Sequence, residues 1–283
     1  MSLIAVPNVS EGRDAGFIVR CHEALVEAGA RVLDVHADTT HNRSVYTISS
    51  DAPRLANSLA ALAEVAASID LTVQEGVHPR LGGLDVCPIV PLKEDMTDVV
   101  EMARWAGGAI HNKTGLPIYF YGEAARRAET VELPALRNGG LERLMRRART
   151  ELPPDLGGRE IDPRKGVVCV GARGPLIAFN VWLKAPKQMA ISIANTVRAP
   201  NVRSLGFEID ADISQVSMNL TDPAKVGIDT AFGQVARVAE RMGAAVVATE
   251  IVGLVEERFL PAPDARAARL LLQPSRSLES ALA

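Results

Sequence analysis

The chain has 283 residues, 47% of them hydrophobic, which is enough for two modest hydrophobic cores or one large core. Its formal net charge of −3 argues against general nucleic-acid binding but leaves room for a local basic pocket that takes an acidic small molecule. The three cysteines are scattered and form no CxxC pair, so we expect reduced, buried thiols and a cytoplasmic protein. We expect no signal peptide and no membrane span, because the chain has neither a basic start followed by an apolar run nor an apolar stretch of spanning length.

Hydrophobic periodicity at the start of the chain predicts the order strand, helix, strand, strand, helix, strand, which is the ferredoxin-like split βαβ pattern. Ser10 or Asp14 is the expected N-cap of the first helix. The predicted ranges are 3–6, 17–28, 31–35, 44–50, 51–69 and 85–90.

After a predicted helix over 94–110, a strand over 117–121, a basic helix over 141–149 and a Pro/Gly-rich loop over 152–166, the pattern recurs. The second set of strands and helices covers 176–183, 187–197, 202–209, 213–220, 225–242 and 244–250. From Gly253 the chain is predicted to be helical, and it is expected to fray into a mobile tail over 274–283. The fold class is therefore α/β (α+β), with two ferredoxin-like βαββαβ subdomains over 1–173 and 174–283.

The stretch from Gly76 to Leu92 carries the most distinctive chemistry, because the loop His78-Pro79-Arg80 precedes an apolar strand. Pro79 restricts His78 to extended backbone, and a rigid strand behind a loop is a good support for a catalytic side chain. His78 is then either a general acid/base or a loop histidine bonded to a carbonyl.

Three polar loops, 8–13, 34–43 and 76–80, are expected along one rim of the sheet, since split βαβ topology brings them to the same edge. Arg43 and Arg80 suit carboxylate recognition, because guanidinium pairs bidentately with carboxylates. The alternative for each arginine is a solvated surface charge.

The sequence lacks the motifs typical of nucleotide binding, serine hydrolysis and zinc-protease chemistry. The chain has no GxGxxG after a strand, no P-loop, no GxSxG and no HExxH. Asp34, His36, Asp38 and His41 lack defined ligand spacing, so no metal site is expected. Cys87 lies in an apolar strand and is expected to be an inert core thiol rather than a nucleophile.

An ordered series of segments resembles the glutamate formimidoyltransferase family, which also forms the N-terminal part of formimidoyltransferase-cyclodeaminase. The segments are VPNVSEGRD, NRSVYT, GVHPRLGGLDVCPIVP, LPIYFYGEAA, GARGPLIAFN, LGFEI, QVSMNL and IVGLV. The resemblance implies two ferredoxin-like subdomains and a homodimer. Because no helical cyclodeaminase segment follows in this sequence, we expect a standalone transferase. It also implies transfer of a formimidoyl group from N-formimidoyl-L-glutamate to tetrahydrofolate, a step of histidine degradation and one-carbon metabolism.

The family's catalytic histidine lies in an H-P-R motif, which matches His78. The resemblance further implies a folate-contacting loop before the GAR segment, made of Gly157, Gly158, Arg159, Glu160, Ile161, Asp162, Pro163, Arg164, Lys165 and Gly166. The chain departs from the family at His36, where an Asp is usual, and at Asp38, where a Gly is usual. Gly174-Pro175 also replaces a Lys-Phe pair.

The hypothesis is that His78 carries one proton between the two amines of the transfer, with Asp38 or Asp85 orienting it. Weaker candidates for substrate contacts are Asp38, Asn42, Arg43 and Arg80. Tetrahydrofolate is a co-substrate, and no metal, nucleic-acid or membrane partner is expected. Two alternatives remain open: a folate enzyme that uses 5-formyltetrahydrofolate or formimidoylglycine as donor, and a non-catalytic ferredoxin-like amino-acid sensor.

Overall fold

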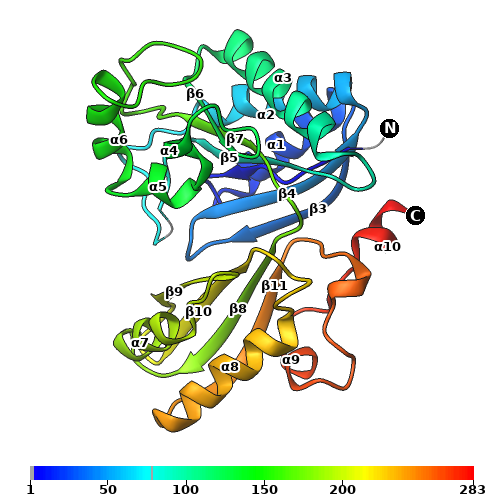
Figure 1. The fold of residues 1–283 in the computed structure, drawn as a ribbon, viewed down its shortest axis with the longest axis vertical. Helices are drawn as coiled ribbons and strands as arrows, with labels where there is room; N and C mark the ends of the chain where they lie inside the picture. Colours follow the sequence, from blue (N-terminus) through cyan, green and yellow to red (C-terminus); the bar gives the residue numbers. More distant parts are fainter. Residues whose placement is uncertain (1–2, 78) are drawn as a thin grey trace. The chain divides into compact units, whose positions relative to one another are not determined.

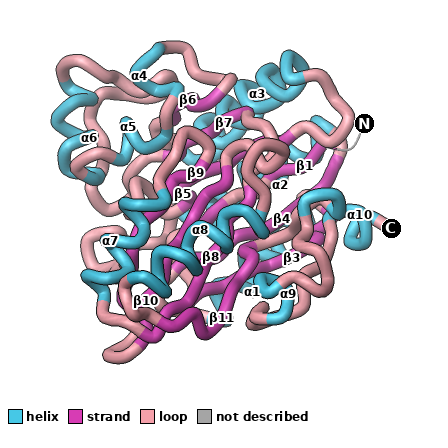
Figure 2. The backbone as a smooth tube through the Cα atoms, turned by 60° about the horizontal axis from the view of Figure 1, so that its bottom comes forward, coloured by secondary structure: helices cyan, strands magenta, loops and turns pink. Residues whose placement is uncertain are grey.

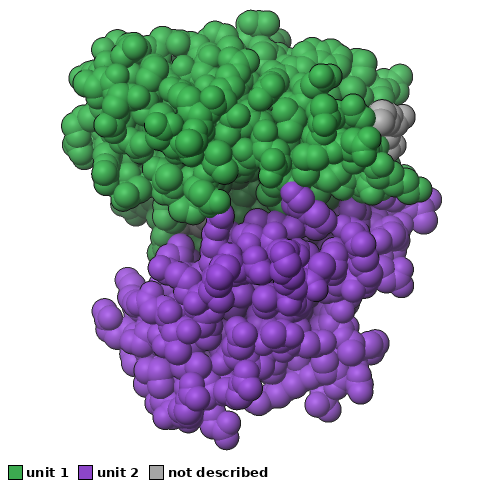
Figure 3. Space-filling view, in the orientation of Figure 1, with its two compact units in different colours: residues 1–173 green, residues 174–283 purple. Residues whose placement is uncertain are grey.

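The computed structural model describes residues 3–77 and 79–283, which divide into one unit ending at Arg173 and a second unit beginning at Gly174 (Figure 1, Figure 3). Each unit has its own sheet and its own hydrophobic core. Within these described ranges, no helix combines the length and the apolarity that a membrane span requires.

The sheet of the first unit contains the predicted split βαβ order and two further strands. Its strands are β1 (Leu3–Ala5), β2 (Asn8–Val9), β3 (Arg31–Asp38), β4 (Arg43–Ser50), β5 (Leu84–Val90), β6 (Ile118–Gly122) and β7 (Val168–Ala172). β1 and β2 act as one interrupted strand between β4 and β5, because Pro7 between them has no N–H to donate. β3 pairs with the other edge of β4, and β7 and then β6 continue the sheet in parallel beyond β5.

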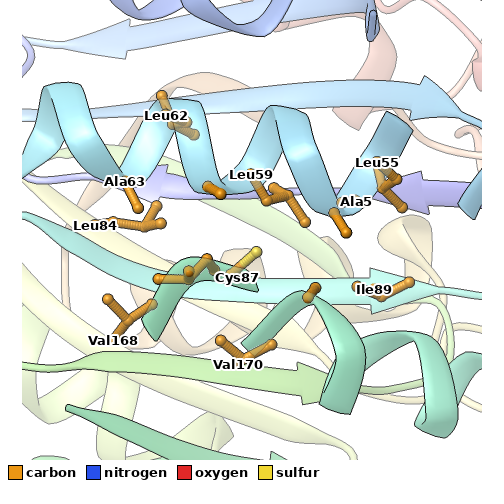
Figure 4. Packing of buried hydrophobic residues seen from close by; sticks show 14 of the residues in the cluster. Ala5, Leu55, Leu59, Leu62, Ala63, Leu84, Cys87, Ile89, Val168 and Val170 are labelled. Atoms are coloured by element: carbon orange, nitrogen blue, oxygen red, sulfur yellow. The ribbon is translucent and has the colours of Figure 1, made fainter. Parts of the chain in front are cut away.

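Three long helices cover one face of this sheet. The helices of the unit are α1 (Ala15–Glu27), α2 (Ala52–Ala66), α3 (Met96–Thr114), α4 (Ala128–Val131), α5 (Leu133–Arg137) and α6 (Gly140–Arg149). Of the two predicted candidates, Asp14 and not Ser10 caps α1, and Asp51 caps α2, each carboxylate accepting a backbone N–H of the first turn. Figure 4 shows Leu55, Leu59 and Leu62 of α2 packed in the core with apolar side chains of β5 and β7.

A second, smaller core lies on the opposite face of β5, β6 and β7. Tyr119 of β6 and Val86 of β5 pack there with Leu136 of α5 and Leu144 of α6. This packing places the C-terminal end of α5 beside β5, which matters for the candidate site.

The second unit is a βαββαβ fold with the strand order β11-β8-β10-β9, and each neighbouring pair is antiparallel. Its strands are β8 (Ile177–Lys184), β9 (Val202–Glu208), β10 (Ile213–Leu220) and β11 (Ala245–Val252), and its two long helices are α7 (Lys187–Val197) and α8 (Ile228–Arg241). Both helices pack on one face of the sheet (Figure 2), over Phe179, Val181 and Val216. The predicted ferredoxin-like fold class is confirmed.

Two strands are absent from the sequence prediction. β2 lies in the stretch 8–13, which the sequence predicts to be a polar loop, and it pairs with β4 and β5. β7 follows the Pro/Gly-rich loop directly and pairs in parallel with β5 and β6. It has only five residues, two of which are Gly171 and Ala172. Its partners are distant in sequence, so local periodicity gives little signal for it.

The prediction of a helical stretch from Gly253 onward is wrong. The described chain there is mostly loop, with a 3-10 turn at Glu257–Phe259, α9 (Arg266–Arg269) and α10 (Leu278–Leu282). Pro261 and Pro263 explain the difference, because a proline inside a helix removes a hydrogen bond and clashes with the preceding turn.

Candidate functional site

The three polar loops of the first unit meet through direct hydrogen bonds, which confirms that they share one rim. Gln74 Nε2 donates to the carbonyl of Ser10 at 2.7 Å and to Glu11 Oε2 at 2.8 Å. Arg13 Nε donates to the carbonyl of Thr39 at 2.8 Å. Loops that follow β2 and β3 are therefore joined to each other and to the loop that enters β5.

Asn42 joins the first two loops to Glu75, the residue directly before the third loop. Its Oδ1 accepts the Gly12 N–H at 2.9 Å, and its Nδ2 donates to the Glu75 carbonyl at 2.7 Å. The side chain is buried, and the backbone has φ 48°, a left-handed conformation that Asn tolerates better than most residues. Asn42 therefore has a structural role in the rim, because both ends of its amide bond to backbone groups.

Gly12 shows how closely the loops approach. A Cβ at this position would lie 2.4 Å from the Asp38 carbonyl oxygen and 2.5 Å from the Arg43 nitrogen, both of them backbone atoms. Only glycine allows such an approach without a shift of the main chain.

Asp38 and His41 form a pair across the turn between β3 and β4. His41 Nδ1 lies 2.6 Å from Asp38 Oδ2, while Asp38 Oδ1 accepts the backbone N–H groups of Thr40 and His41. Burial alone would raise the pKa of Asp38. The hydrogen bonds from His41 and Thr40 outweigh this effect, so the pKa of Asp38 lies below its usual value. β3 extends through Asp38, so the polar loop is shorter than predicted.

Asp85 is fixed by two partners inside the unit. Its Oδ1 accepts the Leu81 N–H at 2.7 Å, and its Oδ2 accepts a hydrogen bond from Arg137 Nη2. The carboxylate is only 2% exposed, and burying a charge at this depth requires such pairing.

The arginines of the rim lie in a shared electrostatic environment. Burial and the charge of Arg137 lower the pKa of Arg43 to about 10, while Asp85 and Asp38 act in the opposite direction. Arg80 Nη2 donates to the His41 carbonyl at 3.2 Å. Its Nη1 is buried and has no hydrogen-bond partner among residues 3–77 and 79–283. A carboxylate ligand would supply the acceptor that this nitrogen lacks.

The 157–166 segment lies against the end of the His-Pro-Arg loop. Gly166 forms an antiparallel bridge with Gly82, and the next residue, Val167, donates its N–H to the Leu81 carbonyl at 2.9 Å. Gly166 has φ 70°, and a Cβ there would lie 2.0 Å from the Leu81 carbonyl oxygen. The two predicted segments are therefore neighbours within one unit.

Several charged side chains of the 157–166 segment already have partners on the surface of the unit. Arg164 Nε pairs with Asp70 at 2.9 Å, and Glu160 pairs with Arg149 at 2.8 Å. Arg159 donates to backbone carbonyls at the end of α6. Ile161 is buried in the smaller core with Leu81, which anchors the middle of the segment.

His78 lies outside the described residues, so its role stays a prediction. The structure brings Asp38, Asn42, Arg43 and Arg80 together around the loop that contains it. Within the described part of the chain, no group of three or more His, Cys, Asp or Glu side chains has the arrangement of a metal site.

Sequence reasoning missed two contributors to the rim. The Asp38–His41 pair has a local signal, since an acid and a histidine three residues apart in a turn can meet. Arg137 has none, because it is 52 residues from Asp85 and comes from a short helix outside the βαββαβ pattern.

The thiols take no part in this arrangement. Cys87 and Cys169 are fully buried in strands, and burial raises the pKa of each well above its usual value. This confirms the prediction that Cys87 is a buried core thiol, and the raised pKa disfavours its use as a nucleophile.

Comparisons with known proteins agree across both units. The model of the formiminotransferase domain, N-terminal subdomain, matches residues 2–173, and the formiminotransferase domain model matches residues 178–264. The chain is 38% identical to "Glutamate formimidoyltransferase" of Thermoplasma acidophilum, with 92% of this chain and 90% of the relative covered. It is 34% identical to the protein of the same name from Streptococcus pyogenes, with 90% and 89% covered.

A longer relative has a different name. "Formimidoyltransferase-cyclodeaminase" of Sus scrofa is 35% identical over 90% of this chain, and the match spans 50% of the relative. Matches to both subdomain models, together with identity above 30% over nearly the whole length of shorter relatives, identify the family. The chain belongs to the formiminotransferase family.

Proposed function

We propose that the chain is a glutamate formimidoyltransferase, which moves the formimidoyl group of N-formimidoyl-L-glutamate to N5 of tetrahydrofolate and releases L-glutamate. The family match over both units and the names of the two shorter relatives support this activity. As a transferase of one-carbon groups, it would link histidine degradation to folate metabolism.

The reaction moves one proton along with the one-carbon group. N5 of tetrahydrofolate attacks the amidine carbon of the donor, and a new C–N bond forms as N5 loses its proton. The bond from that carbon to the glutamate nitrogen then breaks, and the nitrogen gains a proton. One imidazole that titrates near neutral pH can accept the first proton and deliver the second.

We assign this proton transfer to His78. The support is that its loop is held on both sides: Asn42 bonds to Glu75 before it, and Asp85 bonds to Leu81 after it. The described residues on either side are therefore fixed, and a held geometry supplies much of the rate in a two-substrate transfer. Asp38 or Asp85 would orient the imidazole, in addition to their contacts with His41 and Arg137.

Arg43, Arg80 and Asn42 are assigned to the carboxylates of the glutamate donor. The support is the buried Arg80 Nη1 without a partner in the described ranges and the concentration of guanidinium groups beside it. Guanidinium groups in a desolvated rim favour a bound carboxylate over a free one.

Tetrahydrofolate is assigned to the 157–166 segment as co-substrate. The bridge between Gly166 and Gly82 brings this segment beside the loop of His78, as the transfer requires. We further propose a cytoplasmic homodimer that needs no metal and binds neither nucleic acid nor membranes.

The observation that carries the proposal is the set of hydrogen bonds through which three segments distant in sequence, around Gly12, Asn42 and Gly166, meet the described residues on either side of His78. The test is spectroscopic measurement of 5-formimidoyltetrahydrofolate formed when the purified protein is given tetrahydrofolate and either formimidoylglutamate or formimidoylglycine. We expect turnover with formimidoylglutamate and none with formimidoylglycine. The formyl alternative is assayed separately, as loss of 5-formyltetrahydrofolate with L-glutamate as acceptor, because a formyl group cannot supply the imino nitrogen; we expect no loss. Binding of glutamate without turnover or folate affinity would instead indicate a sensor.

A further inference from the structure

We propose that Arg137 is a positioning residue of the transfer site, which acts through Asp85 to hold the loop His78-Pro79-Arg80. The inference rests on the proposed function, because it needs this loop to carry the reaction. Arg137 ends α5, in the connection between β6 and β7 that the ferredoxin-like pattern does not include.

The first step of the argument is the way the loop after Glu75 ends. Asp85 Oδ1 accepts the N–H of Leu81, the residue directly after Arg80, at 2.7 Å. The Leu81 carbonyl accepts the Val167 N–H at 2.9 Å, and the Gly82 carbonyl accepts the Ser10 hydroxyl at 2.7 Å. The main chain after Arg80 is therefore fixed by three hydrogen bonds, and the one nearest the loop depends on Asp85.

The second step is that Asp85 depends on Arg137. The Asp85 side chain is 2% exposed, so water cannot solvate its charge. A buried carboxylate stays ionised and in place only when it is paired and hydrogen-bonded. Arg137 Nη2 supplies the charged donor to Oδ2, which leaves Oδ1 for the Leu81 N–H.

The third step is charge. Arg137 also acts on Arg43, lowering its pKa, so the pair lies within the same electrostatic environment as the proposed carboxylate site. The Arg137 Nε atom is buried and has no hydrogen-bond partner in the described part of the chain. Arg137 therefore has two effects: it fixes Asp85, which holds the Leu81 N–H, and it adds positive charge near Arg43.

The chain contains a matched control in the same unit. Asp155, with a side chain 4% exposed, accepts the Phe120 N–H at 2.8 Å and a hydrogen bond from Arg127 Nη2 at 3.1 Å. This pair repeats the construction of Asp85 and Arg137, but the N–H that it holds belongs to β6 and not to the His-Pro-Arg loop. Loss of Arg127 should therefore destabilise the unit about as much as loss of Arg137 does, without lowering the rate of transfer.

The experiment compares Arg137→Met, Arg137→Lys and Arg127→Met in the full chain. It measures the melting temperature, kcat per folded enzyme, and KM for formimidoylglutamate and tetrahydrofolate. A loop displaced by about 1 Å can cost roughly 100-fold, so we expect kcat of Arg137→Met to fall about 10- to 100-fold. KM for tetrahydrofolate should change less than about threefold, because the 157–166 segment keeps its own contacts.

Arg137→Lys should recover most of kcat, since lysine restores the charge beside Asp85 although not the planar fork. Arg127→Met should lower the melting temperature by a similar amount and keep kcat within about twofold. The inference is overturned if Arg137→Met keeps wild-type kcat, or if Arg127→Met loses as much kcat as Arg137→Met.

Should Arg137→Met fail to fold, Arg137→Gln is measured in its place. The glutamine amide N–H can still donate to Asp85 Oδ2, but the charge of the guanidinium is gone. A comparable loss of kcat supports the inference, and kcat within about twofold of wild type overturns it. Absence of turnover in the wild-type protein would refute the proposed function itself, which separates the two failures.

Discussion

Replacing Asn42 by alanine tests how the rim is held together. The change removes the acceptor of the Gly12 N–H and the donor to the Glu75 carbonyl, and it leaves alanine at φ 48°. An unpaired buried group costs about 1–3 kcal/mol, with less at the exposed Glu75, where water can replace the amide. The left-handed backbone adds about 1 kcal/mol for a residue with a Cβ. We expect the free energy of unfolding to fall by about 2–5 kcal/mol, a large share of the roughly 5–15 kcal/mol typical of a domain.

The assay is urea unfolding followed by tryptophan fluorescence. Trp105 lies in α3 of the first unit and Trp182 in β8 of the second, so a Trp182→Phe background restricts the signal to the first unit. Two control variants separate the contributions. Asn42→Gly loses the same hydrogen bonds without the left-handed strain, and Asn42→Asp keeps an acceptor for the Gly12 N–H.

We expect the order of stability to be wild type, Asn42→Asp, Asn42→Gly and Asn42→Ala. The reasoning is refuted if Asn42→Ala unfolds within about 0.5 kcal/mol of wild type, the range of an ordinary surface substitution. A glycine variant less stable than the alanine variant would contradict the assignment of strain at this position.

Three further predictions follow from other contacts. Gly12→Ala should abolish activity and lower the melting temperature, because its Cβ would meet backbone atoms at 2.4–2.6 Å. The control is Gly108→Ala, whose Cβ would have nothing within 4 Å. It should leave activity unchanged and leave the melting temperature unchanged or slightly higher. The folded-state pKa of Asp38 lies below its usual value, so its ionised form stabilises the fold above about pH 4, and this contribution is lost as pH falls through the folded pKa. Denaturant titrations should therefore show a wild-type advantage over Asp38→Asn that is present at pH 6 and shrinks in acid; an advantage that grows on acidification would contradict the sign. Burial raises the pKa of Cys21 to about 11 and that of Cys87 still further, so neither thiol should react with Ellman's reagent in the folded protein at pH 8, and rapid labelling would show that these strands and helices open readily.

Elements whose pattern is local were predictable from the sequence. The strand over Ile213–Leu220 and the helix over Lys187–Val197 have the predicted ends. Apolar residues alternate with polar ones through the second half of the strand, and they recur at helical spacing in the helix. β7 was not predictable in this way, since its place beside β5 depends on a partner about 80 residues earlier in the chain.

In the candidate site, too, features set by local topology were predictable and contacts set by tertiary packing were not. Split βαβ topology was enough to predict that the loops near Gly12, Asn42 and Arg80 share a rim. It could not indicate that Asn42 would use both ends of its amide on backbone groups. Nor could it indicate Arg137, whose contact with Asp85 depends on how a short helix packs against the far face of the sheet.

The most direct test of the account is the rate of 5-formimidoyltetrahydrofolate formation by His78→Ala, with His22→Ala as control. His22 is an exposed residue of α1, so its loss should not affect transfer. General acid–base catalysis typically contributes about 10²- to 10⁴-fold, and we expect kcat of His78→Ala to fall within that range while the protein keeps its wild-type melting temperature. A folded His78→Ala protein with the same kcat as His22→Ala would contradict the account.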